Sequence, residues 1–281
     1  ISIVRGDSAA VVDMAVAENV VATTHESGAV WVWQSGRSTE LMSSGDEVAE
    51  ADVAVTGDQA WLVAAVSSDL ATNVYGWKLS VRVRPAARLE IGQQPGEFPL
   101  LIGASGSSAI LATVDDEALV WRWNIESKQH EEVGRQQNEV LTLTAAPDGR
   151  TIAYAGVAGG RGEGGGAALV EIDSGRRFEL AATQSDSITA SALDATGQKL
   201  ATAQRMSEFD ETGAVILWKP DIALGSASQE RVFEFDPERR DVTALAFSQA
   251  GDWVAAGHNS GAVSVWRLES RRRKPVFTYG A

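Results

Sequence analysis

Carboxylates are the side chains with the clearest chemical pattern in this sequence. They gather in loops around a series of short apolar segments, at Asp7, Asp46, Glu47, Glu97, Asp115, Asp116, Glu139, Asp186, Asp210 and Asp241. Asp and Glu in turns accept local backbone N–H bonds and keep sheet edges soluble. Gathered on one surface, the same groups would attract a basic partner. The sequence alone leaves both interpretations open.

Residues that build catalytic centres are sparse. The chain has no cysteine, which excludes disulfides, thiolate metal sites and cysteine nucleophiles. It has three histidines. His25 and His258 stand in two copies of one repeated segment, and we interpret them as turn residues copied by duplication. His130 is expected on a solvated outer strand, and the GxSxG, HExxH and P-loop motifs are absent.

Two further segments have unusual composition. The glycine-rich run GGRGEGGG, 159–166, lacks the strand and helix that flank a phosphate-binding loop, so we interpret it as a connection between strands. The basic run RRRK, 271–274, is either a solvated sheet edge or a docking site.

Charge and composition restrict the classes of partner. The chain of 281 residues carries a net charge of -14, which repels nucleic acid and anionic lipid. No apolar run approaches the roughly 18 residues of a membrane helix. The first residues, ISIVRGDS, do not have the pattern of a secretory leader. We therefore expect a cytoplasmic protein that binds neither nucleic acid nor membranes.

One segment recurs along the whole chain. HESGAVWVW, 25–33, is nearly repeated as HNSGAVSVW, 258–266, and related segments lie between them. The copies end at Trp33, Trp77, Trp123, Ile172, Trp218 and Trp266, with gaps of 44, 46, 49, 46 and 48 residues. A period of this length is typical of propellers and other repeat folds.

Each copy has the same internal order of segments. An alternating segment is followed by a turn, a short apolar run, a loop, the segment that ends in Trp, and a last strand-like piece. Alternation over four to eight residues between Gly, Asp and Asn turns predicts β-strands. Four strands in each of six repeats predict an all-β fold, a β-propeller of four-stranded antiparallel blades that spans 1–281 as a single domain.

The repeats resemble those of the WD-repeat family. The resemblance is carried by VTALAFSQAGDWVAAGHNSGAVSVWRLES, 242–270, and by VLTLTAAPDGRTIAYAGV, 140–157. Two family features are missing. The Gly-His pair before each first strand is replaced by GDS, GDE, PGE, QNE, SDS and RRD, and the Asp six residues before Trp by Ser27, Glu117, Thr212 and Ser260. We therefore expect that the buried polar network of each blade is absent, and that apolar packing replaces it.

The number of blades follows from the ends of the chain. The 15 residues after Trp266 and the 33 residues up to Trp33 together make one more repeat. Six blades would then close, with residues 1–6 and 274–279 as candidates for the last outer strand. Seven blades, one of them incomplete, are the alternative.

The WD-repeat resemblance implies a rigid platform for peptides or protein domains. It also implies that the loops before first strands and those between second and third strands lie on one face, which the ten carboxylates would make acidic. We expect a non-catalytic interaction scaffold or sensor without a cofactor, part of a larger assembly, that binds a basic protein through this acidic loop face.

Two other functions were weighed. A propeller hydrolase would hold a metal in a central channel, but no histidine recurs on the first strands that would line it. Nucleic-acid binding through RRRK would be steeply salt-dependent, and the net charge argues against it.

Overall fold

The computed structural model describes most of the chain as β-sheet. The described residues are 11–17, 20–25, 27, 29–34, 37–42, 51–55, 61–68, 71–78, 89–94, 102–105, 110–114, 119–124, 127–135, 140–146, 150–157, 166–171, 174–180, 187–205, 213–221, 223–236 and 241–279. They contain no helix, and so no helix long and apolar enough to cross a membrane. The chain divides into two compact units, 1–133 and 134–281.

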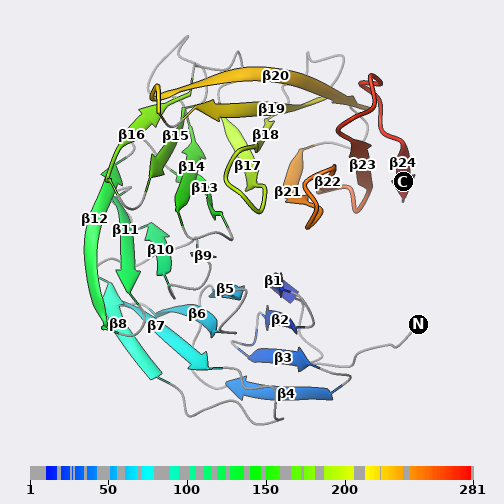
Figure 1. Ribbon diagram of the computed structural model, residues 1–281. Helices are drawn as coiled ribbons and strands as arrows, with labels where there is room; N and C mark the ends of the chain where they lie inside the picture. The colour runs from blue at the N-terminus through cyan, green and yellow to red at the C-terminus, as the bar shows by residue number, and fades with distance from the viewer. Residues whose placement is uncertain are drawn as a thin grey trace. The chain divides into compact units, whose positions relative to one another are not determined.

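The first unit contains three sheets of four consecutive strands (Figure 1). The sheets are built from β1 (Val11–Ala17), β2 (Val20–His25), β3 (Val30–Gln34) and β4 (Arg37–Met42); β5 (Ala51–Val55), β6 (Trp61–Ser68), β7 (Ala71–Lys78) and β8 (Leu89–Gln94); and β9 (Ile102–Ser105), β10 (Ile110–Val114), β11 (Leu119–Asn124) and β12 (Gln129–Arg135). The division between the two units falls inside β12.

The second unit repeats this plan. Its sheets are built from β13 (Val140–Ala145), β14 (Thr151–Gly156), β15 (Ala167–Glu171) and β16 (Arg177–Glu179); β17 (Ile188–Leu193), β18 (Leu200–Gln204), β19 (Gly213–Asp221) and β20 (Ser226–Phe235); and β21 (Val242–Phe247), β22 (Trp253–His258), β23 (Val263–Arg267) and β24 (Phe277–Tyr279). Each strand pairs antiparallel with its neighbours in the chain.

The all-β class and the four-stranded antiparallel sheets predicted from the sequence are confirmed. The repeated tryptophans occupy the third strand of their sheets, at Trp33, Trp77, Trp123, Trp218 and Trp266, whereas Ile172 lies outside the described residues. Residues 277–279 form the fourth strand of the last sheet, within the predicted range of 274–279. The other candidate for that strand, 1–6, lies outside the described residues.

A repeated irregularity marks the first strands. In four sheets the pairing of the first and second strands shifts register near the start of the first strand, between Val11 and Asp13, Val140 and Thr142, Ile188 and Ala190, and Val242 and Ala244. A bulge of this kind adds one residue to one strand and increases the local twist. The repeat is therefore copied in backbone geometry as well as in residue type.

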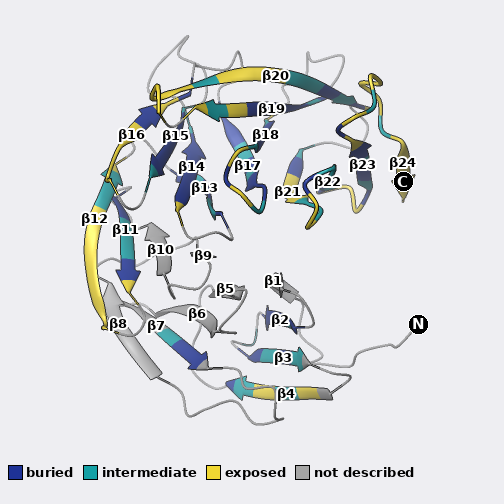
Figure 2. Ribbon diagram, viewed as in Figure 1, coloured by how far each residue is buried: buried dark blue, intermediate teal, exposed yellow. Residues whose placement is uncertain are grey.

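The core of the second unit lies between successive sheets. One cluster joins Leu169 and Phe178 of one sheet to Leu200 and Trp218 of the next. Figure 2 shows the contrast between β14, which is buried along its length, and β20, which is exposed or half-buried along most of its length. Truncation of a fully buried aromatic side chain to Ala costs about 3–5 kcal/mol, so these contacts between sheets are a major source of stability.

Polar ties inside the sheets are few but present. The Nε1 of Trp218 donates a hydrogen bond of 2.8 Å to the Oγ1 of Thr202 on the neighbouring strand. The indole nitrogens of Trp31, Trp33 and Trp266 are buried and have no hydrogen-bond partner among the described residues. The sheet of β17–β20 therefore keeps one buried polar bond, which is less than the network whose absence was predicted.

Hydroxyl groups tie the first strands of the second unit to one another. The Oγ atoms of Thr142 on β13 and Ser191 on β17 lie 2.9 Å apart, and the backbone N–H of Ser191 donates to the same threonine oxygen. The hydroxyl of Thr189 donates to the carbonyl of Val242, which begins β21. These bonds set the position of each first strand relative to the first strand of the next sheet.

A buried carboxylate closes the turn between β17 and β18. The Oδ1 of Asp194 accepts the backbone N–H groups of Gln198 and Lys199 at 2.8 and 2.9 Å. Its Oδ2 accepts the hydroxyl of Thr196 at 3.0 Å. The ammonium group of Lys199 donates to the carbonyl of Gly251, in the corresponding turn of the next sheet. One acidic residue thus orders its own turn and helps to connect two sheets.

We expect Asp194→Ala to lower the free energy of unfolding by about 1–3 kcal/mol, because it leaves donors in a part-buried turn without an acceptor. Urea denaturation measures the change. Glu269→Ala, which removes an exposed carboxylate, should change stability by no more than about 0.5 kcal/mol. Equal losses in the two variants would contradict this role of Asp194.

Candidate functional site

The predicted acidic face falls almost entirely outside the described residues. This applies to Asp7, Asp46, Glu47, Glu97, Asp115, Asp116, Glu139, Asp186 and Asp210. Asp241 is described, directly before β21 as its place in the repeat requires. It is half-buried, and its backbone carbonyl accepts the N–H of Asn259 at 3.0 Å. The acidic face therefore stays a prediction.

The repeated histidines are buried strand residues, which corrects their interpretation as turn residues. His25 is the last residue of β2 and His258 the last of β22, and they are 3% and 5% exposed. They lie opposite Val11 and Val242 in the two ladders, so their places in the repeat are equivalent.

Each of these histidines is tied to a hydroxyl group of its own sheet. The Nε2 of His25 lies 2.9 Å from the Oγ1 of Thr23, and the Nε2 of His258 lies 3.0 Å from the Oγ of Ser264. The His258 ring also meets the ring of Phe235 edge-on, with 4.7 Å between centroids. Buried and engaged in this way, both imidazoles serve packing within and between sheets.

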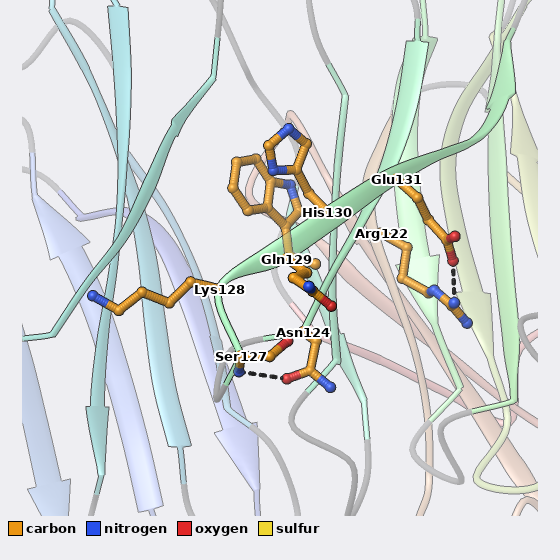
Figure 3. A pocket seen from close by; sticks show the side chains of 8 residues that line it. Arg122, Asn124, Ser127, Lys128, Gln129, His130 and Glu131 are labelled. Atoms are coloured by element: carbon orange, nitrogen blue, oxygen red, sulfur yellow. Dashed lines mark hydrogen bonds and ion pairs between the residues drawn. The ribbon is translucent and has the colours of Figure 1, made fainter.

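A cavity of about 630 Å³ lies along the β11–β12 hairpin in the first unit. It is lined by polar side chains that include Arg122, Asn124, Lys128 and Glu131. Figure 3 shows that Arg122 is ion-paired with Glu131, whereas Lys128 extends away from that pair. The charged groups labelled there do not converge on one point. The hairpin offers a polar groove.

His130 belongs to the same groove. It is exposed on β12, as predicted for a solvated fourth strand. Its ring nevertheless stacks on Trp123, with 4.3 Å between centroids, and meets Trp121 edge-on at 5.5 Å. The sequence analysis did not identify this groove. The alternation of Trp121 and Trp123 on one strand of a hairpin, with His130 on the other, is the signal that could have predicted the stack.

Lys128 occupies a strained backbone position at the tip of this hairpin. Its φ is 58°, in the left-handed region that favours glycine. Gly175 and Gly225, with φ of 67° and 64°, hold the same place in the corresponding hairpins of the second unit. In two of the three turns this residue donates its N–H to the carbonyl four residues before it. The turn geometry therefore accounts for the conformation of Lys128 without a ligand.

Metal-binding side chains do not cluster in the part of the chain that the structure describes. No three His, Asp or Glu residues there could hold a metal ion together. The described residues thus offer no site for the hydrolase alternative.

One buried titratable group has a shifted pKa. Burial raises the pKa of the Tyr154 hydroxyl above its ordinary value, and the positive charge of Arg177 opposes this shift only in part. The guanidinium carbon of Arg177 lies 5.8 Å from the centre of the tyrosine ring. The side chain is fully buried in β14, so it cannot reach a substrate, and its role is structural.

The raised pKa predicts a loss of stability at alkaline pH. Below about pH 10 both folded and unfolded states keep the phenol proton, and the contribution of Tyr154 is fully present. Above that pH the unfolded state releases the proton first, so stability falls as pH rises through the raised folded pKa. We expect Tyr154→Phe to remove this part of the alkaline loss, measured by urea denaturation at increasing pH. Tyr75→Phe is the control, since Tyr75 on β7 is only half-buried, and an equal effect of both changes would contradict the assignment.

No protein-family model matches the chain, and no curated protein matches its sequence significantly. The resemblance to WD repeats therefore rests on the repeated residues themselves. The four-stranded antiparallel sheets are compatible with it.

Proposed function

We propose that the chain is a non-catalytic binding module that holds a partner protein as part of a larger assembly. The observation that carries the proposal is the use of its reactive side chains for packing. His25, His258 and Tyr154 are buried inside sheets of the described structure. Many exposed charges of the described residues lie instead on fourth strands and turns, where a partner can reach them.

The fold that we propose for this module is a closed six-bladed propeller of the WD-repeat type. The spacing of the repeats supports it, because the ends of the chain together supply one more repeat length. The last sheet supports it as well. Phe277 and Tyr279 are 57% and 70% exposed. Tyr279 pairs with Val263 as Phe233 pairs with Val215 on the preceding sheet, yet Phe233 is buried against the following sheet. A ring would cover the exposed pair with its next sheet.

We expect the double change Phe277→Ser and Tyr279→Ser to lower the free energy of unfolding by about 3 kcal/mol or more, as for buried aromatic residues. The matched control is Leu224→Ser, since Leu224 is 78% exposed at a hairpin tip and a ring would not cover it. Denaturation of the whole chain measures both. A double variant as stable as the control would contradict closure, and top-view particle averages with seven blades would contradict the count.

The binding surface that we propose is the acidic loop face, and the partner is a basic protein. The net charge of -14 and the repeated placement of carboxylates before first strands support it. Asp241 shows this placement in the described structure. Asp194 lies in the turn between the first and second strands of its sheet. Its carboxylate accepts hydrogen bonds from two backbone N–H groups of that turn. Local turn chemistry is therefore the competing explanation for the loop carboxylates.

Affinity purification with the wild-type chain, a loop variant and a control variant as baits distinguishes these explanations. We expect the wild-type chain to capture a basic protein that is lost when Asp46, Glu47, Asp116 and Asp241 are all changed to Lys. Circular dichroism checks that the variant is folded.

A matched variant controls for net charge. It changes four exposed carboxylates on fourth strands to Lys, namely Glu40, Glu132, Glu179 and Glu230, and should keep the partner. Equal capture by all three baits would show that the loop carboxylates serve their turns only.

A further inference from the structure

The connection between β23 and β24 is longer than its two counterparts in the second unit. It runs from residue 268 to 276, whereas residues 222–225 suffice between β19 and β20 and residues 172–176 between β15 and β16. The extra length contains four consecutive cations, Arg271, Arg272, Arg273 and Lys274. We refer to residues 268–276 as the cationic loop.

The backbone of the cationic loop is held against the preceding sheet. The guanidinium group of Arg231 on β20 donates to the carbonyls of Leu268 and Ser270. Further along, the N–H of Glu234 donates to the carbonyl of Arg273 at 3.0 Å. Contacts of this kind order the backbone from which the cations extend, which lowers the entropy that the loop loses when a ligand binds.

Three of the four cations of this loop have no acidic partner among the described residues. All four are exposed, and Arg271, Arg272 and Lys274 form no ion pair with any described residue. Only Arg273 has one, at 3.3 Å from Glu234. Two arginines elsewhere in the same unit do pair with a glutamate two residues away, in Arg177–Glu179 and Arg267–Glu269. In a chain with 38 acidic and 24 basic residues, a run of four cations is a local exception to the negative charge.

We propose that the cationic loop is a docking site for an acidic segment of a partner polypeptide. Guanidinium groups bind carboxylates with two parallel hydrogen bonds, and three free cations on an ordered loop fit a short run of Asp or Glu. A short peptide has few charges and meets little repulsion from the remaining surface. A long nucleic acid would be repelled by the net charge of -14, which favours a peptide. This site is separate from the acidic loop face and does not depend on it.

Fluorescence anisotropy with the whole chain tests the proposal. The probe is a labelled ten-residue peptide of alternating Glu and Ser, with a Lys-Ser peptide and a ten-nucleotide oligothymidylate as comparisons. We expect the acidic peptide to bind, and to bind more weakly as NaCl rises from about 50 to 300 mM. Changing Arg271, Arg272 and Lys274 to Glu should raise its Kd about tenfold or more, because three ion pairs are lost together.

A second variant separates a local site from general charge effects. Changing the exposed Lys128, Arg176 and Lys219 to Glu alters the net charge equally and should raise the Kd less than about twofold. Equal weakening by both variants, or no difference between the acidic and Lys peptides, would overturn the proposal. Tighter binding of the oligonucleotide than of the acidic peptide would overturn it in favour of a nucleic-acid site.

Discussion

Packing of the fourth strand of one sheet against the next sheet is the interaction on which the second unit depends. Phe233 lies 5.7 Å from Trp266 between ring centroids, and Phe235 lies 4.7 Å from His258. Because side chains alternate across a strand, the two phenylalanines share a face and are buried together. A four-stranded sheet has two faces to cover, so each repeat needs a neighbour.

Much of this architecture could be predicted because it depends on residue alternation and on a constant spacing. The third-strand position of Trp218 and Trp266 follows directly from these patterns. The burial of His25 and His258 was missed because residue alternation does not show at which residue a strand ends. Each histidine is the last residue of its strand, so an error of one residue places it in the turn instead of the core. The bond between Thr202 and Trp218 joins different strands, so only the pairing register reveals it.

The candidate site was harder to predict than the fold for a physical reason. Strand alternation constrains the direction of every side chain, whereas a loop carboxylate can face its own backbone or a partner. Asp194 and Asp241 show the difficulty, since one caps its turn through its side chain and the other contacts Asn259 through its backbone. The cationic loop was recognised as a basic run, but the contacts of its backbone with β20 became visible only in the structure.

The register shift at the start of β1, β13, β17 and β21 has a consequence for how such a chain can change over generations. A one-residue slip in a strand moves every following side chain to the opposite face. Where two repeats carry the extra residue at the same point, recombination between them leaves each apolar side chain on its original face. Whole repeats can then be exchanged or duplicated in phase, while a single-residue deletion in the regular part of the strand would move the side chains beyond it to the opposite face.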